Sequence, residues 1–300
     1  MTAPTLPTLG FVGLGHMGGA MADRLMSAGY AVLGTSRTRA REEALIAHGL
    51  RWCDTPHEVA EAADIVLTSL PDDAVLNAVA SGPDGILAGL TAGKAWVDLS
   101  TISPQASREL AACVRKNGAT LLDAPVSGSV PQVRAGTLTI MVGGNEDAYD
   151  RVEPVLRRLG TPTHVGANGQ GLVLKLAINI SLAVQTLAFA EGLLLAARSG
   201  IDRELALGVM ANSAIGSPML KARAPLVLDL PEEAWFTLGL MQKDVELARD
   251  VAQGLGVPLP TADRADEVLG LARTLGYAQS DLAALFQVLE EVADGRRTAA

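Results

Sequence analysis

A short glycine-rich turn near the N-terminus constrains the fold of this chain more than any other feature. The turn reads Gly13-Leu14-Gly15-His16-Met17-Gly18, follows the apolar run Leu9–Val12 and opens the amphipathic segment Met17–Ala28. In such a unit the first glycine makes the tight turn, the second lets the backbone approach a ligand, and the third lets the helix pack on the strand. The chain is therefore expected to begin with a βαβ unit.

The first half of the chain alternates between strand-like and helix-like segments. The expected strands are short apolar or β-branched runs bounded by Gly, Pro, Asp or Ser: Leu9–Val12, Ala31–Gly34, Ile65–Leu70, Ala95–Leu99, Thr120–Asp123 and Leu138–Val142. The expected helices between them include Met17–Ala28, Arg39–His48 and Pro104–Lys116. This alternation predicts an α/β fold of the Rossmann type, a doubly wound parallel sheet with helices on both faces.

The strand signal stops after about residue 165. One long helical run, Gly169–Ser199, is closed by Gly200, and four further helical segments follow: Arg203–Asn212, Leu240–Gly254, Ala262–Leu275 and Asp281–Val292. We therefore expect a Rossmann domain over residues 1–166 and an all-helical domain over residues 167–300, with the long helix between them.

Charge and composition exclude several classes of partner. The net charge of −9 argues against nucleic acid and anionic membranes, because both bind basic faces. Two cysteines and four scattered histidines show no metal-ligand spacing, so we expect no metal site. The N-terminal MTAPTLPT lacks the regions of a signal peptide, and the apolar stretch Leu176–Ala190 is shorter than the ~20 residues of a membrane span. We expect a cytoplasmic protein in which this stretch is a buried core helix.

The glycine turn would place a pyrophosphate at a helix N-terminus, which predicts a dinucleotide cofactor. A chain that binds NAD would place an acidic residue about 20 residues later, on the ribose 2′-hydroxyl. Here the second strand is followed by Ser36-Arg37-Thr38, and the first acidic residue is Glu42. No carboxylate then repels a 2′-phosphate, and these three residues are expected to bind it, so the predicted cofactor is NADP(H). The alternative is that the arginines form a solvated face.

Lys175 and Asn179 are four residues apart in the long helical run and share one face. A lysine in an otherwise apolar helix is costly unless it is paired or faces a cleft. Such a lysine can donate a proton to an oxygen that becomes an alkoxide when hydride arrives, and can take it back in the reverse reaction. Asn179 would orient it and bind substrate. The alternative is a lysine that extends to water.

Two loops at strand ends are further candidates. The turn Ser127-Gly128-Ser129 can offer hydroxyl and backbone N–H groups to a substrate carboxylate, or be an ordinary strand-end turn. The pair Leu70-Pro71 follows a strand, where a loop commonly lines a cofactor cleft, or it simply stops the strand.

Four segments carry a family resemblance. In chain order they are Asp98–Pro104 (DLSTISP), Asp123–Gly128 (DAPVSG) with Gly136-Thr137-Leu138 and Gly143-Gly144, Gly169-Gln170-Gly171 leading to Lys175 and Asn179, and the pair Lys243-Asp244. Together they resemble the β-hydroxyacid dehydrogenases, the 3-hydroxyisobutyrate dehydrogenase family. The resemblance implies that Thr101 contacts both cofactor and substrate, that Lys243 contacts the cofactor, and that Phe236 and Asp244 contact the substrate. It also implies a homodimer or larger oligomer.

One branch of that family is more similar. Ser127-Gly128-Ser129, Ser36-Arg37-Thr38 and Ser217-Pro218-Met219 are similar to the glyoxylate/succinic semialdehyde reductases, which implies reduction of a small aldehyde acid with NADPH. Gln132-Val133 depart from a small Gly-Ala pair that is frequent in the family. The alternatives are an imine reductase and a non-catalytic, NADP-binding assembly module, and both relatives usually lack a lysine at the position of Lys175.

Overall fold

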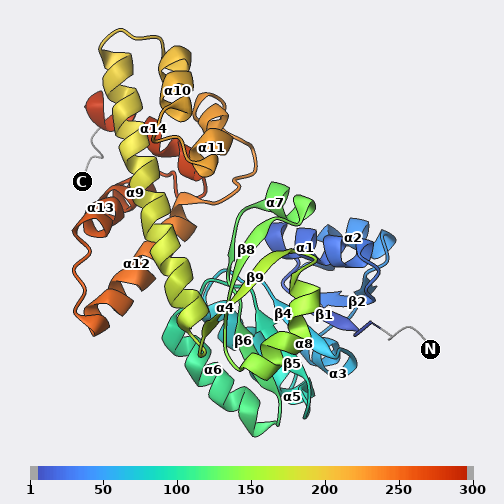
Figure 1. Cartoon of the computed structure of the whole chain (residues 1–300). Helices are drawn as coiled ribbons and strands as arrows, with labels where there is room; N and C mark the ends of the chain where they lie inside the picture. Colours follow the sequence, from blue (N-terminus) through green and yellow to red (C-terminus); the bar gives the residue numbers. More distant parts are fainter. Residues whose placement is uncertain (1–5, 296–300) are drawn as a thin grey trace. The chain divides into compact units, whose positions relative to one another are not determined.

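The structure is a computed structural model that describes residues 6–295. The chain divides into two compact units between Lys175 and Leu176, inside one long helix (Figure 1). The boundary expected at residues 166 and 167 lies just before that helix, whereas the division falls later because Leu172, near the helix start, packs into a core of the first unit. The first five residues of the MTAPTLPT segment lie outside the described residues.

A nine-stranded sheet forms the centre of the first unit. Its strands are β1 (Leu9–Val12), β2 (Val32–Thr35), β3 (Arg51–Trp52), β4 (Ile65–Thr68), β5 (Ala95–Asp98), β6 (Thr120–Asp123), β7 (Val126–Ser127), β8 (Leu138–Gly143) and β9 (Gly160–Gly166). The strands are ordered β3-β2-β1-β4-β5-β6-β8-β7, with β9 paired to β8, and every pair from β3 to β6 is parallel. The order of the first six is that of a doubly wound dinucleotide-binding sheet, so the predicted fold class is confirmed.

The sheet is not parallel throughout. Strand β8 runs antiparallel to β6 and β7 and parallel to β9. A parallel connection needs a crossover of about a dozen residues or more, and the short helix α7 (Val130–Ala135) between β7 and β8 is too short for one. The expectation of a purely parallel sheet is therefore wrong at this edge.

Two hydrophobic cores lie on opposite faces of the sheet, because successive strand residues point to opposite sides. Phe11 and Val97 belong to one core, and their neighbours Val12 and Trp96 belong to the other. The helices of this unit are α1 (His16–Ser27), α2 (Glu43–Ala47), α3 (Pro56–Ala62), α4 (Asp73–Ala80), α5 (Ile86–Gly89), α6 (Pro104–Lys116), α7 and α8 (Glu146–Leu156). The helix expected at 39–48 is instead a 3-10 turn, Arg39–Arg41, followed by α2.

The second unit is built of helices across its described residues, as expected, apart from an isolated β-bridge between Thr237 and Asp281. Its helices are α9 (Gln170–Arg198, which begins in the first unit), α10 (Arg203–Asn212), α11 (Pro218–Leu228), α12 (Leu238–Leu255), α13 (Pro260–Thr274) and α14 (Leu285–Ala293), with a 3-10 turn at Leu282–Ala284. Sequence patterns did not predict α11, which begins with Pro218 and contains Pro225. The helices enclose one core, built from residues of all six.

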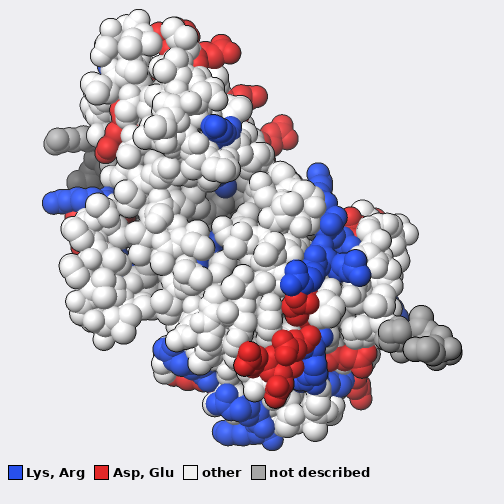
Figure 2. All heavy atoms as spheres, viewed as in Figure 1, with Lys and Arg blue, Asp and Glu red and all other residues white. Residues whose placement is uncertain are grey.

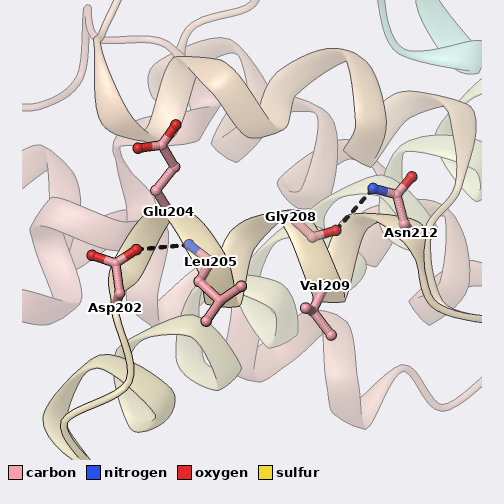
Figure 3. A pocket seen from close by; sticks show the side chains of 6 residues that line it. All are labelled: Asp202, Glu204, Leu205, Gly208, Val209 and Asn212. Atoms are coloured by element: carbon pink, nitrogen blue, oxygen red, sulfur yellow. Dashed lines mark hydrogen bonds between the residues drawn. The ribbon is translucent and has the colours of Figure 1, made fainter.

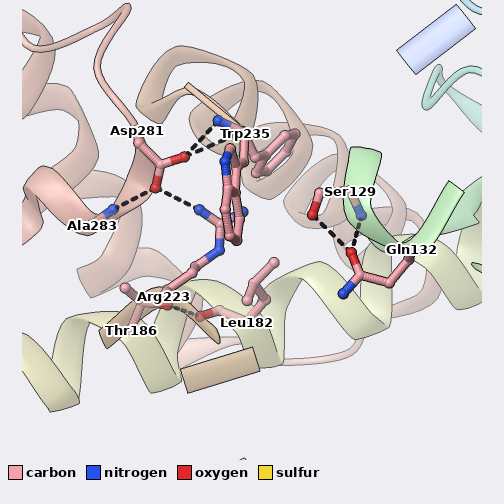
Figure 4. Close-up of polar contacts among 9 residues, drawn as sticks. Ser129, Gln132, Leu182, Thr186, Arg223, Trp235, Asp281 and Ala283 are labelled. Atoms are coloured by element: carbon pink, nitrogen blue, oxygen red, sulfur yellow. Dashed lines mark hydrogen bonds and ion pairs between the residues drawn. The ribbon is translucent and has the colours of Figure 1, made fainter. Parts of the chain in front are cut away.

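A buried ion pair organises part of this helical unit (Figure 4). Asp281 is 1% exposed, and its Oδ1 accepts a hydrogen bond from Arg223 at 2.5 Å. Its Oδ2 accepts the backbone N–H groups of Trp235 at 2.8 Å and Phe236 at 3.1 Å. Removing one partner of such a pair typically costs about 3–5 kcal/mol, because the other charge stays buried. The pair therefore fixes the backbone that presents Phe236.

Helix α9 is 29 residues long, so the expectation that its apolar stretch is too short for a membrane span is wrong. By length and composition, it is the one described helix that meets the requirements of a span, and 39% of its most apolar window is buried. Ala183, Leu187 and Leu193 pack into the core of the second unit, as expected for a core helix. Leu195, by contrast, is 72% exposed.

Candidate functional site

The three glycines of the turn after β1 have different surroundings. A Cβ on Gly13, whose φ is +93°, would lie 2.5 Å from the Ser69 carbonyl oxygen, and one on Gly18 would lie 1.9 Å from the Gly13 carbonyl oxygen. Both positions therefore require glycine for packing. Gly15 caps α1, and a Cβ on this residue would have no neighbouring atom within 4 Å. The turn has open space where the N-terminus of α1 is accessible, which fits a pyrophosphate.

The turn lies at the point where the strand order reverses. Strands β1 and β4 are neighbours. After β1 the chain adds β2 and β3 on one side, and after β4 it adds β5 and β6 on the other side. The loop after β4 begins with Ser69-Leu70-Pro71, and a Cβ on Gly13 would lie 2.8 Å from the side chain of Leu70. Doubly wound sheets bind ligands outside the carboxyl ends of the strands at such a reversal. The structure therefore brings the predicted Leu70-Pro71 loop beside the glycine turn.

The loop after β2 is basic and exposed. Arg37, Thr38, Arg39 and Arg41 are all exposed. Figure 2 shows Lys and Arg side chains gathered over the part of the first unit where α1, α2 and α7 lie in Figure 1. The guanidinium of Arg39 lies 5.7 Å from the centre of the Trp52 ring. Of the arginines in this loop, Arg37 is the one nearest in sequence to the end of β2.

A carboxylate does reach this loop, contrary to the sequence expectation. Glu42 is buried, at 7% exposure, and accepts a hydrogen bond from Ser36 Oγ at 2.9 Å. The acid folds back because the chain makes a 3-10 turn there instead of continuing one helix. The Ser36 hydroxyl proton is thus already bound, and Arg37 and Thr38 are the exposed members of the predicted phosphate-binding triplet.

A buried polar network connects the ends of β4 and β5. Asp98 is 1% exposed, and its Oδ1 accepts hydrogen bonds from Thr68 Oγ1 at 2.7 Å and Ser100 Oγ at 2.6 Å. Ser100 Oγ in turn accepts the backbone N–H of Leu70 at 2.9 Å. Asp98 therefore holds the loop that contacts the glycine turn. Burial raises the pKa of Asp98, and the hydrogen bonds from Ser100 and Thr68 oppose that rise.

Thr101 follows this network and is half-buried. Thr101 does not cap the following helix, because Ser103 caps α6 by accepting the N–H of Ala106 at 3.0 Å. Ser103 itself is held by Asp73, which accepts its N–H at 2.9 Å. Thr101 thus lies in the segment between β5 and α6, at the carboxyl end of the sheet.

The predicted carboxylate-binding turn is present, but one member is already bonded. Gly128 has φ +132°, which only glycine adopts readily, and it is exposed. Ser129 begins α7, and both its N–H and its hydroxyl donate to Gln132 Oε1 at 2.9 Å (Figure 4). Gln132, which stands where the family frequently has a small residue, therefore accepts both hydrogen bonds that Ser129 can donate. Ser127, the other serine of the turn, is half-buried.

Asp123, at the end of β6, is a site residue for which sequence reasoning gave no role. Its carboxylate accepts the backbone N–H groups of Gly169 at 2.7 Å and Leu172 at 3.1 Å, at the start of α9. Burial raises the pKa of Asp123, and the hydrogen bonds from these two N–H groups oppose that rise. The only sequence signal was the DAPVSG segment itself, which does not reveal a partner 46 residues away.

Along α9, Lys175 is 8% exposed and Asn179 is fully buried one turn later. Within the second unit, Asn179 Nδ2 donates to Asp244 Oδ2 at 2.5 Å, and Lys243 Nζ lies 3.0 Å from Asp244 Oδ1. The structure therefore brings together three predicted site residues from distant parts of the sequence. Phe236 is half-buried in the loop that Asp281 holds.

Within residues 6–295, no group of three or more His, Cys, Asp or Glu side chains could hold a metal ion.

Comparison with protein families covers nearly the whole chain. Residues 8–169 match the NAD-binding domain of 6-phosphogluconate dehydrogenase, and residues 169–289 match the NAD-binding domain of NADP-dependent 3-hydroxyisobutyrate dehydrogenase. The junction at 169 coincides with the glycine that precedes α9.

Curated relatives match over most of their length. The chain is 36% identical to 2-hydroxy-3-oxopropionate reductase of Escherichia coli, covering 95% of this chain and 98% of the relative. It is 31% identical to the chloroplastic glyoxylate/succinic semialdehyde reductase 2 of Arabidopsis thaliana, covering 94% and 79%. It is also 31% identical to an NAD-dependent L-serine dehydrogenase of Pseudomonas aeruginosa, covering 95% and 97%.

Solved structures also match over nearly the whole length of both chains. The 3-hydroxyisobutyrate dehydrogenase of Mycobacterium tuberculosis with L-serine is 31% identical, with a TM-score of 0.81 and coverage of 95% and 99%. Psf3 in complex with NADP+ and 2-OPP is 27% identical, with a TM-score of 0.87 and coverage of 94% and 100%. An imine reductase from Pseudomonas sp. is 26% identical, with a TM-score of 0.64 and coverage of 95% and 100%.

The burial of Asp98 predicts a pH dependence of stability. None of the described residues gives its Oδ2 a hydrogen-bond partner, and its pKa is raised in the folded state. A raised carboxyl pKa stabilises the folded state below the ordinary value of about 4, and this contribution is lost as the pH rises through the folded pKa. We therefore expect the unfolding free energy of the wild type, relative to Asp98→Asn, to fall as the pH rises from about 4 toward neutrality.

Chemical denaturation at a series of pH values measures this difference. Asp150→Asn, which changes an exposed carboxylate of α8, is the matched control. A wild-type advantage over Asp98→Asn that stays constant across the range would contradict the assignment.

Proposed function

Because this chain belongs to the β-hydroxyacid dehydrogenases, the 3-hydroxyisobutyrate dehydrogenase family, we propose that it reduces a small aldehyde acid to the hydroxyacid with NADPH, or catalyses the reverse oxidation. The observation that carries the proposal is the environment of Lys175. Its side chain is 8% exposed on an apolar helix, one turn before the buried Asn179. A lysine is rarely buried at such a position without a function.

The proposed reaction needs a hydride donor, a proton donor and a residue that is held in a fixed orientation beside them. A bound nicotinamide cofactor supplies the hydride. The ammonium of Lys175 donates a proton to the carbonyl oxygen as it becomes an alkoxide, and the amine takes that proton back in the reverse direction. Asn179 donates a hydrogen bond to Asp244, so its side-chain amide has a fixed orientation on α9.

The substrate carboxylate needs donors that are not already bound. Gln132 accepts both donors of Ser129, so the hydroxyl of Ser127 and the backbone N–H of Gly128 are proposed to bind the carboxylate. The φ of +132° at Gly128 sets the direction of this turn. Ser129 then shapes the turn through α7 instead of binding substrate directly.

An imine reductase is the second candidate function. The similarity to the imine reductase from Pseudomonas sp. supports it, although its TM-score of 0.64 is lower than the 0.81 of the 3-hydroxyisobutyrate dehydrogenase. Lys175 favours carbonyl chemistry, because imine reductases usually lack a lysine at this position, whereas here a lysine is available to protonate the alkoxide.

A substrate comparison tests the proposed function. The purified protein is assayed for loss of reduced-nicotinamide absorbance with glyoxylate, succinic semialdehyde and a cyclic imine, each with NADPH and NADH. We expect turnover of an aldehyde acid with NADPH. Lys175→Ala should lower kcat by about 100- to 10,000-fold, while NADPH still binds.

Lys221→Ala is the matched control, because Lys221 is an exposed lysine of α11, and it should keep wild-type turnover. Better turnover of the cyclic imine than of either aldehyde acid would favour the second candidate. Loss of NADPH binding together with turnover in Lys175→Ala would count against the role of Lys175 as proton donor.

The cofactor preference is proposed to depend on Arg37. A guanidinium beside a 2′-phosphate makes charged hydrogen bonds that NADH lacks, and each is worth about 1.5–3 kcal/mol. Arg37→Ala should therefore weaken NADPH binding by about 10- to 100-fold and leave NADH binding nearly unchanged. Fluorescence titration of both cofactors measures this.

Arg39→Ala serves as the control for charge alone, because Arg39 belongs to the same loop but lies over Trp52. Equal weakening of both cofactors by Arg37→Ala, or tighter binding of NADH than NADPH by the wild type, would overturn the assignment. A relative that is NAD-dependent makes the second outcome a real test.

We also propose that the chain forms a homodimer or a larger homo-oligomer. Apolar side chains remain uncovered on α9 and α10: Leu195 is 72% exposed, Leu205 61% and Val209 62%. Figure 3 shows Leu205 and Val209 in the lining of a pocket on the surface of α10. Adjacent uncovered apolar side chains of this kind commonly mark protein interfaces.

Light scattering after size exclusion should give a mass of at least twice the chain mass of 31.0 kDa. The double variant Leu205→Glu with Val209→Glu should lower that mass, because two carboxylates would be buried in the interface. A wild-type mass equal to one chain would refute the proposal.

A further inference from the structure

The first turn of α9 is capped by a residue from another element. α9 begins at Gln170, and Gly169 before it has no side chain that could cap the helix. Asp123, at the end of β6, takes this role: it accepts the N–H of Gly169 at 2.7 Å and the N–H of Leu172 at 3.1 Å. Asp123 is fully buried, so water does not compete for these N–H groups.

Glycines leave the space that this carboxylate needs. A Cβ on Gly171 would lie 2.8 Å from Asp123 Oδ2 and 2.4 Å from the Met141 carbonyl oxygen. A Cβ on Gly143 would lie 2.7 Å and 2.8 Å from the two carboxylate oxygens. Strand ends, carboxylate and helix start are therefore in direct contact, and the helix has no room to shift along its axis while the contact holds.

Lys175 follows Leu172 by three residues, which is about 4.5 Å along the helix axis. Asp123 also precedes Ser127 by only four residues, so the strand end that holds the helix proposed to donate the proton also leads into the turn proposed to bind the carboxylate. Misplacing a reacting group by about 1 Å can lower turnover by about 100-fold. We propose that Asp123 is a positioning residue that sets the location of Lys175, an inference that rests on the proposed role of Lys175.

Asn145 provides a matched comparison within the same unit. Its side chain caps α8 by accepting the N–H of Ala148 at 2.9 Å, and α8 carries none of the proposed site residues. Asn145→Ala therefore removes a helix cap without touching α9. Asp123→Asn keeps the shape of the side chain but presents an NH2 group to one of the two N–H donors, so at least one capping bond is lost.

Three measurements separate positioning from stability alone. Hydrogen exchange reports on the amides of residues 167–176. The rate of acetylation of Lys175 by acetic anhydride, compared with that of Lys221, reports on the lysine without any need for activity. The third quantity is kcat for the better of glyoxylate and succinic semialdehyde, normalised to the number of NADPH-binding sites, together with KM and the Kd of NADPH.

We expect Asp123→Asn to speed exchange at the start of α9, to speed acetylation of Lys175, and to lower kcat per binding site by about 10- to 100-fold with little change in NADPH affinity. Asn145→Ala should leave all three at wild-type values. If Asp123→Asn does not fold, Gly171→Ala tests the same contact, because its Cβ must displace the carboxylate or the helix start. The same changes are expected there.

Unchanged acetylation of Lys175 and unchanged kcat per binding site, in a variant whose helix start exchanges faster, would overturn the inference and leave Asp123 as a structural cap. If Lys175→Ala keeps wild-type turnover, the proposed role of Lys175 as proton donor fails instead, and if neither aldehyde acid is turned over by the wild type, the proposed function fails. The exchange and acetylation comparisons would then still decide whether Asp123 sets the location of Lys175.

Discussion

The carboxylate of Asp123 is the contact on which the arrangement of this site depends. It joins the end of a central strand to the start of α9, and it does so by accepting backbone N–H groups that the helix cannot satisfy itself. Burying a charged group is costly unless it is fully hydrogen-bonded, so the contact tolerates few other geometries. Gly143 and Gly171 stand where any larger residue would collide with this carboxylate. The result is a helix whose starting point is defined by the sheet.

Other buried acids repeat this arrangement. Asp98 holds Ser100, which holds the loop that begins with Leu70, and Asp281 holds the backbone of Trp235 and Phe236. Glu42 holds Ser36 after β2. In each case a carboxylate near the end of one element fixes a loop that carries a proposed site residue. Loops on a protein surface are otherwise mobile, and a directional hydrogen bond to a buried carboxylate restricts them. The four acids therefore supply rigidity where the proposed chemistry needs it.

Sequence patterns predicted the architecture well, because local periodicity and glycine spacing directly reflect strand, turn and helix geometry. The six strands expected from apolar runs are all present, and the glycine turn lies at the reversal of the strand order. The patterns failed where a tertiary contact decides the outcome. Strand β9 contains two glycines and a proline and forms because β8 pairs with it. Glu42 bonds Ser36, and Gln132 occupies the donors of Ser129, through backbone turns that spacing alone does not reveal. The proposed roles of Lys243 and Phe236 came from family resemblance, because neither has a local signal.

The N-termini of α1 and α9, both in the first unit, have different electrostatic surroundings. α1 begins at a glycine, has no acidic residue in its first turn and has open space beside Gly15, so its positive end can attract an anion. The positive end of α9 is already neutralised by Asp123. We therefore propose that an anionic cofactor binds at the start of α1 and not at the start of α9, even though both helices start at the carboxyl edge of the same sheet. If Lys175 acts as proposed, α9 offers an anionic substrate the charge of this lysine and not its helix dipole. In a chain with a net charge of −9, positive groups are local, so the open N-terminus of α1 and the side chain of Lys175 are the groups proposed to bind anions.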